Sequence, residues 1–365
     1  ENNCKIIGDL ELFYSLNKNK NFIGITGTNG KSTTTSLINH IFQDNNVSCA
    51  MGGNIGVPVF DLGHFDNYIF EISSYQLDLS NKLKFNISAL LNITPDHLDR
   101  YSNLDEYIKS KEQIYRNQDE NDIFLINIDN IKCYEIYKKL IKNQQFKVKI
   151  IPLSVTQRLD NSISLIENKI YNKISNNIIE TTQSRYLSGQ HSKQNILFAY
   201  AMAYFSKISD SDIMNSISSF KGLKHRLQFL KTIDNISFIN DSKATNIESA
   251  ICALESYENI FWIAGGKLKD KDLSLILKHQ NKINKAFLIG QDQKIFANFL
   301  NDNKIDNYIC GNLDNAFIKA VDIAKKSNKK INILLSPACA SFDQWSNFEE
   351  RGDYFCKLVN NFNYG

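Results

Sequence analysis

The chain contains, at residues 22–33, the run Phe-Ile-Gly-Ile-Thr-Gly-Thr-Asn-Gly-Lys-Ser-Thr. The apolar part, 22–25, predicts a buried parallel strand, and Leu37, Ile38, Ile41 and Phe42 follow with the spacing of one helix face. A strand, a tight turn and a helix N-terminus in this order form an anion site, because the first helical N–H groups lack partners and the helix dipole favours negative charge. The run therefore predicts a loop that binds nucleotide phosphates.

Each residue type in this loop suits that task. The glycines allow the backbone to approach a phosphate closely, Lys31 can reach the outer phosphates, and the Ser32 hydroxyl is placed to ligate Mg²⁺. The strict Walker pattern requires a glycine at position 25, where Ile25 stands, so an ordinary glycine-rich turn is the competing interpretation. The expected ATP-binding residues of the loop are Gly27, Thr28, Asn29, Gly30, Lys31, Ser32 and Thr33.

Composition limits the class of protein. The 365 residues suggest two or three domains, and 42% hydrophobic with 22% charged residues is ordinary for a soluble globular chain. A formal net charge of +3 with scattered lysines argues against a nucleic-acid surface, and no apolar run is long enough to span a membrane. Seven dispersed cysteines without a C-x-x-C pair indicate neither a zinc site nor a disulfide framework, so we expect a cytoplasmic protein.

The pattern of strands and helices predicts an α/β fold in two parts. Short apolar runs at 68–72, 88–93 and 123–127 alternate with helical segments, and residues 146–185 are expected to form an antiparallel excursion. A second alternating series follows a boundary near residue 222. We expect a central ATP-binding domain at 1–222 with a mostly parallel sheet and a P-loop-like turn, followed by a Rossmann-like domain at 223–365.

Two polar groups follow strands of the first predicted sheet. Glu71 lies in an otherwise apolar strand, where a carboxylate must be paired or bound to a metal; hydrogen bonds from nearby hydroxyls are the alternative. His97 lies between Asp96 and Asp99 just beyond the next strand, as a metal ligand or a solvated loop residue. Because ligands bind at the carboxyl ends of parallel strands, Ser32, Glu71 and His97 together favour a metal site.

Two further segments are ambiguous. Lys109 and Lys111 lie in a helical segment and would point to different sides, and the pattern alone leaves both on a solvated face. Asp241 and Lys243 lie between a strand and a helix, with Arg226 upstream as a cation for phosphate, so this loop either grips a ligand or is simply capped by Thr245 or Asn246.

A cysteine near the end of the chain also allows two interpretations. Cys339 follows a predicted strand in the run Ser-Pro-Ala-Cys-Ala-Ser at 336–341. No histidine is near in sequence, which favours a small buried thiol over a nucleophile.

Several motifs occur in the order found in one known family. They are G-T-N-G-K-S-T, G-G-N-I-G, E-I-S-S-Y-Q-L, N-I-T-P-D-H-L-D-R-Y, L-S-G-Q-H, H-R, N-D-S-K-A-T-N and S-P-A-C-A-S-F-D-Q. The chain resembles the Mur ligases from residue 8 to its end, and the last motif, with N-F-E-E-R-G at 347–352, resembles the D-glutamate-adding branch.

The resemblance implies an ATP- and Mg²⁺-dependent ligase of peptidoglycan synthesis that joins D-glutamate to UDP-N-acetylmuramoyl-L-alanine through an acyl phosphate. It implies that Lys111 is a carbamylated metal ligand beside Ser32, Glu71 and His97, which replaces the solvated-face interpretation. It also implies catalysis by Lys243 beside the reacting centre. The other implied contacts are Asn195, Arg226 and Asp241 for ATP, Asn54 and Ser73 for the muramoyl-alanine end, and Thr245, Lys269, Ser341 and the Phe348 backbone for D-glutamate.

The chain departs from the family pattern in two places. The family's G-x-H-N reads Gly189-Gln190-His191-Ser192, which puts one polar contact near adenine in question. The family's UDP-binding domain is not found before Gly8, so we expect residues 1–20 to be a linker from that domain. We further expect a monomer that binds neither nucleic acid nor membrane.

Three other functions remain open from the sequence. A folylpolyglutamate synthase shares the phosphate loop and the H-R motif, and another Mur ligase would take a different amino acid. A truncated nucleotide-binding module would keep ATP binding without turnover.

Overall fold

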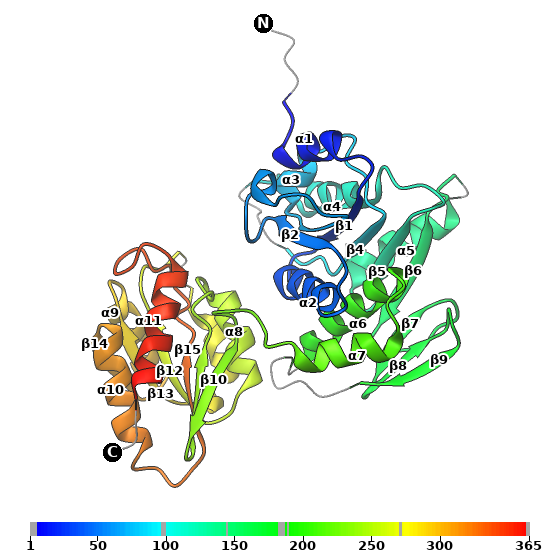
Figure 1. Ribbon diagram of the computed structural model, residues 1–365. Coiled ribbons are helices and arrows are strands. Elements are labelled where there is room, and N and C mark those ends of the chain that lie inside the picture. The colour runs from blue at the N-terminus through cyan, green and yellow to red at the C-terminus, as the bar shows by residue number, and fades with distance from the viewer. Residues whose placement is uncertain are drawn as a thin grey trace, which may run out of the picture. The chain divides into compact units, whose positions relative to one another are not determined.

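The computed structural model describes residues 6–95, 100–143, 145–181, 187, 190–269 and 272–362, without the side chains of residues 190 and 191. The chain divides into two compact units, Glu1–Phe220 and Lys221–Gly365, which we call unit 1 and unit 2 (Figure 1). The expected boundary was after residue 222. Each unit is built around its own sheet, and both sheets are mostly parallel, which confirms the expected α/β class.

Unit 1 contains a nine-stranded sheet in the order β2-β3-β1-β4-β5-β6-β7-β8-β9. The phosphate loop follows β1, which lies between β3 and β4. The strands are β1 Asn21–Thr26, β2 Cys49–Gly53, β3 Asn67–Glu71, β4 Ile87–Leu90, β5 Ile123–Asn127, β6 Lys149–Ser154, β7 Ile163–Ile166, β8 Lys169–Asn172 and β9 Asn177–Glu180.

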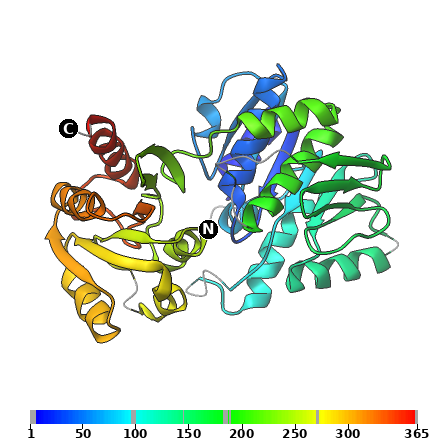
Figure 2. The same cartoon turned by 90° about the horizontal axis from the view of Figure 1, so that it is seen from below.

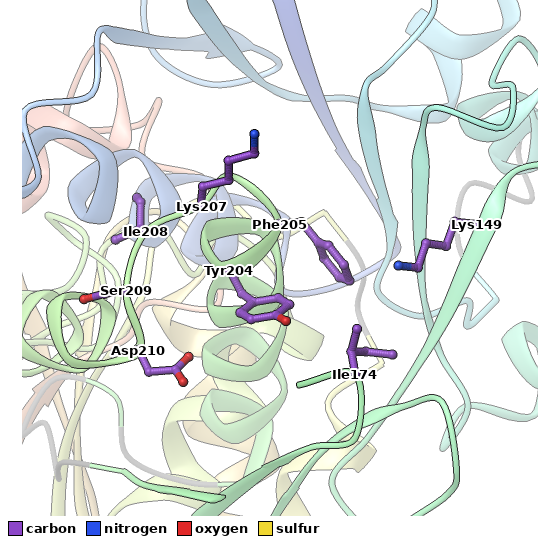
Figure 3. A pocket seen from close by; sticks show the side chains of 8 residues that line it. All are labelled: Lys149, Ile174, Tyr204, Phe205, Lys207, Ile208, Ser209 and Asp210. Atoms are coloured by element: carbon purple, nitrogen blue, oxygen red, sulfur yellow. The ribbon is translucent and has the colours of Figure 1, made fainter. Parts of the chain in front are cut away.

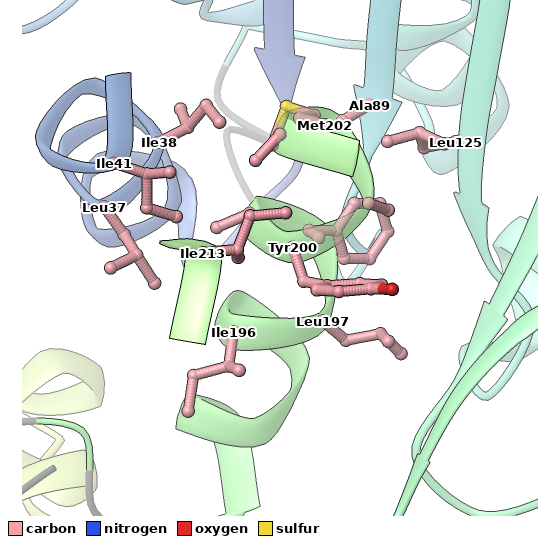
Figure 4. Close-up of a cluster of buried hydrophobic side chains, with 14 of the residues drawn as sticks. Leu37, Ile38, Ile41, Ala89, Leu125, Ile196, Leu197, Tyr200, Met202 and Ile213 are labelled. Atoms are coloured by element: carbon pink, nitrogen blue, oxygen red, sulfur yellow. The ribbon is translucent and has the colours of Figure 1, made fainter. Parts of the chain in front are cut away.

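Helices cover both faces of this sheet. Buried side chains of α2, α6 and α7 form the core on one face, and those of α1, α3, α4 and α5 form the core on the other. In Figure 4, Ile38 and Ile41 of α2 belong to one cluster with Tyr200 of α6, and Ile213 of α7 is drawn between them. The helices are α1 Asp9–Leu16, α2 Lys31–Asp44, α3 Ser74–Asp78, α4 Leu104–Glu112, α5 Ile131–Lys142, α6 Gln190–Phe205 and α7 Asp210–Ser219, with 3-10 turns η1 Val59–Asp61 and η2 Gln113–Tyr115.

The excursion expected over residues 146–185 is only partly antiparallel, which corrects that prediction. Strand β6 pairs with β5 in parallel, and β7 pairs with β6 in parallel. Only the β7-β8-β9 meander is antiparallel. The physical reason is turn length: residues 167–168 and 173–176 are short enough for hairpins. The longer connection, residues 155–162, instead lets the first residues of β7 run parallel to the last residues of β6, with Ile163 beside Leu153.

Residues 1–20 were expected to be a linker, but the described part contains helix α1. Leu10 and Phe13 are buried in the core of unit 1. Glu11 is also buried, and its carboxylate accepts hydrogen bonds from the backbone N–H groups of Asn81, Lys82 and Leu83 at 2.9–3.0 Å. The helix is therefore held by three consecutive amides as well as by apolar packing.

We expect Glu11→Gln to lower the free energy of unfolding by about 1–3 kcal/mol, because the amide keeps one acceptor oxygen and places N–H groups against backbone donors. Urea denaturation of both proteins measures this change. Glu120→Gln, at an exposed position of the same unit, serves as the control and should be neutral. Equal stability of the Glu11→Gln variant and the parent would show that α1 is held by packing alone.

Unit 2 contains a six-stranded sheet in the order β10-β11-β15-β12-β13-β14, parallel except for the edge strand β10. Helices α8 and α9 pack on one face, and α10 and α11 pack on the other, as the view from below also shows (Figure 2). The elements are β10 Gln228–Ile233, β11 Ile236–Asn240, α8 Ile247–Ser256, β12 Ile260–Gly265, η3 Ser274–Lys282, β13 Ile283–Ile289, α9 Gln293–Asp302, β14 Asn307–Gly311, α10 Leu313–Ala324, β15 Ile331–Leu335 and α11 Phe348–Asn361.

None of the helices in the described ranges combines the length and the apolar character that crossing a membrane requires.

Candidate active site

The loop between β1 and α2 has the geometry of an anion site. Gly30 takes the helix N-cap position with φ 85°, a left-handed conformation, and a Cβ there would lie 2.6 Å from the Asn195 Oδ1. The amides of Thr28 and Asn29 donate to the backbone and side-chain oxygens of Asn92, at 3.0 and 2.8 Å. The loop is thereby fixed from the neighbouring strand, and the first-turn amides of α2 face outward from the helix.

Two lysines converge on one carbonyl of this loop. The Lys31 Nζ donates to the Gly27 and Thr28 carbonyls, each at 2.8 Å, and the Lys111 Nζ donates to the Gly27 carbonyl at 2.9 Å. The two nitrogens share an acceptor, so they are close enough to repel each other as ammonium ions. An anion beside the loop would reduce this repulsion.

Lys111 is 1% exposed, and its Nζ lies 4.6 Å from the centroid of the Tyr107 ring. The solvated-face interpretation of Lys111 is therefore wrong. The error arose because helix periodicity identifies faces but does not say which face another element covers. Lys109, two residues earlier in α4, is exposed.

Glu71 ends β3 beside β1 and is 3% exposed. Its Oε1 accepts a hydrogen bond from the Asn54 Nδ2 at 3.1 Å, and its Oε2 is buried without a hydrogen-bond partner among the described residues. Within the described part of the chain, the hydrogen-bond partner of Glu71 is an amide and not one of the nearby hydroxyls. A buried carboxylate oxygen of this kind is costly in free energy, and a cation would satisfy it.

Of the other predicted metal ligands, Ser32 lies within the described residues and His97 does not. Ser32 is buried in the first turn of α2. His97, with its neighbours Asp96 and Asp99, lies outside the described residues. In the described ranges no group of three His, Cys, Asp or Glu side chains could hold a metal. The predicted metal set therefore depends on a residue of which the structure says nothing.

The remaining predicted residues of unit 1 have local partners. The Asn195 Oδ1 accepts from the Thr34 Oγ1 at 3.1 Å, which ties α6 to the start of α2. The Ser73 hydroxyl accepts from the Gln76 amide as the N-cap of α3, in a capping box. Lys31 to Thr33 begin α2 directly after the loop. The ligand contacts expected of Asn195 and Ser73 remain predictions.

In unit 2, the carboxylate of Asp241 is buried at the end of β11. Its Oδ1 accepts from the Leu227 amide at 3.1 Å, and its Oδ2 accepts from the Ser336 hydroxyl at 2.6 Å. Burial raises the pKa of the Asp241 carboxyl to about 7, against the opposing effect of the Ser336 hydrogen bond. The Arg226 Nη1 is a buried atom without a hydrogen-bond partner in the part of the chain that the structure describes.

The raised pKa of Asp241 has a consequence for stability. An acid whose pKa is higher in the folded state than in the unfolded state takes up a proton on folding, so its contribution to stability falls as pH rises from about 4 to about 7. We expect the difference in unfolding free energy between the parent and Asp241→Asn to fall over this window by at most about 4 kcal/mol. Denaturant unfolding at several pH values measures it, and a pH-independent difference would contradict the raised pKa.

Apart from Phe348, which begins α11, the predicted amino-acid contacts lie on loops at the carboxyl ends of the strands of unit 2. Lys243 is half-buried with its Nζ 5.7 Å from the Phe348 ring centroid, Ser341 is buried, and Lys269 is exposed. Thr245 is half-buried, and Asn246 rather than Thr245 is the N-cap of α8. These residues share one edge of the sheet, and their ligand contacts remain predictions.

Cys339 lies in the same group of loops and is fully buried. Burial raises the pKa of the Cys339 thiol to about 12, so it is protonated at neutral pH. This supports the interpretation as a small buried thiol.

Sequence reasoning missed two polar residues that organise these regions. Asn92 holds the phosphate loop through its backbone and side chain, and Arg351 is fully buried in the first turn of α11. Asn92 follows a predicted strand, which was an available signal. Arg351 lies among acidic and exposed residues, and nothing in the pattern of apolar residues indicates its burial.

A separate pocket of about 440 Å³ lies in unit 1 and is lined in part by Lys149, Tyr204, Phe205 and Asp210 (Figure 3). Lys149 is the first residue of β6, so the pocket lies at the edge of the parallel strands opposite the phosphate loop. It contains none of the predicted site residues.

The glycine loop, the two lysines and the buried carboxylate define a nucleotide-phosphate-binding α/β protein. A family model, the Mur ligase middle domain, matches residues 25–203. The chain is 44% identical over 358 residues to UDP-N-acetylmuramoylalanine--D-glutamate ligase of Rickettsia prowazekii (strain Madrid E). The match covers 98% of this chain and 79% of that relative. The chain therefore belongs to the Mur ligase family, as its motifs predicted.

Further relatives agree with this assignment. A protein of the same name from Wolbachia pipientis wMel is 38% identical over 416 residues, covering 99% of this chain and 81% of the relative. Among solved structures, a UDP-N-acetylmuramoylalanyl-D-glutamyl-2,6-diaminopimelate--D-alanyl-D-alanyl ligase from Acinetobacter baumannii is similar with a TM-score of 0.70 at 16% identity, covering 96% of this chain and 78% of that chain. At this identity the likeness shows the fold alone.

Proposed function

We propose that the chain is an ATP-dependent ligase that adds D-glutamate to UDP-N-acetylmuramoyl-L-alanine in the synthesis of peptidoglycan precursors. The substrates are supported by 44% identity to a D-glutamate ligase over nearly the whole chain. The use of ATP is supported by one geometric observation, the convergence of the Lys31 and Lys111 amines on the Gly27 carbonyl of the phosphate loop.

The reaction consists of two displacements. The carboxylate of the muramoyl-alanine attacks the γ-phosphorus of ATP, which forms an acyl phosphate and releases ADP. The neutral amine of D-glutamate attacks the acyl carbon and forms the C–N bond, and one amine proton passes to solvent. The tetrahedral intermediate then breaks its C–O bond to the phosphate group, which leaves as inorganic phosphate. In the first step, anionic reactants must meet, so groups that bind and neutralise phosphate lower the barrier.

We assign the binding of the ATP phosphates to unit 1. The outward amides at the start of α2 and the Lys31 ammonium suit the β- and γ-phosphates, because both are donors without competing negative charge. Asn54 hydrogen-bonds Glu71, so a muramoyl-alanine contact by Asn54 would place this substrate beside the phosphate loop. Ser73 and Asn195 are proposed contacts for muramoyl-alanine and adenine, respectively.

The donor set also fits Mg²⁺. The unpartnered Glu71 Oε2 and the buried Ser32 hydroxyl are oxygen ligands of the type that this ion prefers, with His97 and carbamylated Lys111 as the further proposed ligands. When bound, the ion would neutralise phosphate charge. If Lys111 were an uncharged amine or a carbamate, one of the two like charges near Gly27 would also be removed.

We assign the amino acid to unit 2. Lys243, Thr245, Lys269 and Ser341 lie on its strand-end loops, and Phe348 begins α11. The two lysines suit a substrate with two carboxylates. We assign Lys243 a position beside the reacting carbon. We assign Arg226 to a phosphate of ATP and Asp241 to the ribose of ATP. We further propose a monomer that works in the cytoplasm, where ATP and UDP-linked precursors are found.

The test is phosphate release by the whole enzyme with ATP, Mg²⁺ and UDP-N-acetylmuramoyl-L-alanine, measured over a panel of amino acids. Release that depends on D-glutamate is the expected result. Release with a diamino acid instead would assign another Mur ligase activity, and release with L-glutamate and a folate would assign the folylpolyglutamate branch. ATP binding without release for any of them would leave a binding module.

A further inference from the structure

Among the described residues of unit 2, Arg351 is the most deeply buried cation. Its side chain is 0% exposed, in the first turn of α11. The Nε donates to the Ser242 Oγ at 2.9 Å, the Nη2 donates to the Ser242 carbonyl at 2.8 Å, and the Nη1 donates to the Cys339 carbonyl at 3.1 Å. All three acceptors are neutral, and the guanidinium therefore bridges the loop after β11 to the loop after β15.

The charge of Arg351 has no carboxylate within ion-pair distance among the described residues of the chain. Burial lowers the pKa of the guanidinium to about 10, so it still carries its charge at neutral pH. Burying the ion costs several kcal/mol. The hydrogen bonds to neutral oxygens offset part of that cost, and the more distant carboxylates of Asp343 and Asp241 also favour the charged form.

The bonds of Arg351 bring together the chain segments that carry the proposed amino-acid contacts. Ser242 precedes Lys243, and its hydroxyl donates to the Phe348 carbonyl at 2.8 Å. Cys339 lies two residues before Ser341. A third loop comes close as well, because a Cβ on Gly266 would lie 3.5 Å from the Arg351 Nη1. One side chain therefore holds the backbone next to three separate proposed contacts.

We propose that Arg351 is a positioning residue for the amino-acid site, which it serves by fixing the backbones beside Lys243, Ser341 and Phe348. This inference rests on the proposed function for the identity of the amino acid. A positioning residue of this kind affects binding of the amino acid and leaves ATP binding in place.

The experiment compares Arg351→Met, which removes the charge and the fork of donors, with Arg351→Lys, which keeps the charge. We expect Arg351→Met to raise KM for D-glutamate about 30-fold and Arg351→Lys about 5-fold, with KM for ATP changed less than about 2-fold in each. Lys357→Met is the matched control, because it removes a positive charge from an exposed position of the same helix. It should leave both KM values unchanged.

A second variant keeps the test informative if Arg351→Met does not fold. Ser242→Ala removes one guanidinium bond and the bond to the Phe348 carbonyl, and we expect it to raise KM for D-glutamate about 5-fold. Thermal unfolding of every variant identifies those that are folded. Equal increases in KM for ATP and D-glutamate, no increase at all, or an Arg351→Lys variant as impaired as Arg351→Met would each overturn the proposal.

The parent enzyme separates this inference from the proposed function. If the parent uses another amino acid, the proposed function fails, and the same KM comparison with that amino acid still tests the positioning role of Arg351. If the parent uses D-glutamate and the variants show no selective change in KM, the function holds and the positioning role fails.

Discussion

Replacing Lys111 by alanine is expected to lower kcat for ligation at least about a hundredfold, and more than any other change in α4. The Lys111 amine is buried and donates to the Gly27 carbonyl of the phosphate loop, so the variant loses a polar group at the place where phosphate is proposed to bind. A carbamate on this amine would be lost as well. Steady-state phosphate release with saturating substrates measures the effect.

Lys109→Ala is the control for this prediction. Lys109 belongs to the same helix and has the same charge, but it is exposed. Its replacement should change kcat less than about 2-fold, because exposed substitutions are close to neutral. Near-parental activity of the Lys111→Ala variant would remove Lys111 from the reaction, and equal losses in both variants would point to damage to the helix.

Glu71→Gln is expected to lower kcat about a hundredfold or more, while the free energy of unfolding stays unchanged or rises. The glutamine keeps the size of the side chain and an oxygen for the Asn54 amide. It removes the negative charge whose Oε2 is buried without a partner in the described structure, and that charge costs stability when no cation is present. Activity and urea denaturation of the same preparation measure both quantities.

The opposite changes in activity and stability distinguish a ligand-binding carboxylate from a structural one. Glu120→Gln, at an exposed position, should change neither quantity. Titration with Mg²⁺ adds a third readout, since loss of an oxygen ligand should raise the Mg²⁺ concentration that gives half-maximal activity. A variant that loses stability and keeps its activity would assign Glu71 to the core alone.

The phosphate loop could be predicted from sequence because its parts are local. A buried strand, two glycines, a lysine and a helix start lie within a dozen residues, and their bond geometry leaves few arrangements. Glu71 could be predicted for a similar reason, since a carboxylate at the end of an apolar strand is already anomalous. The α/β class follows from alternating periodicities that do not depend on distant contacts.

The surroundings of Lys111, Glu11 and Arg351 could not be predicted in this way. Each is a charged residue on a helix with other charged residues near it, and each is buried by elements far away in the chain. Lys111 meets Gly27, Glu11 meets residues 81–83, and Arg351 meets Ser242 and Cys339. The family motifs marked Lys111 but gave no indication of its partner.

By itself, the sequence determined the α/β class, the phosphate loop and the membership in the Mur ligases, because local periodicity and ordered motifs can be recognised without knowledge of distant contacts. Only the tertiary structure decided which charged side chains are buried and what they contact. The reason is that burial is a property of packing between elements: a lysine on a helix is a surface residue or part of a site according to which strand end lies against it.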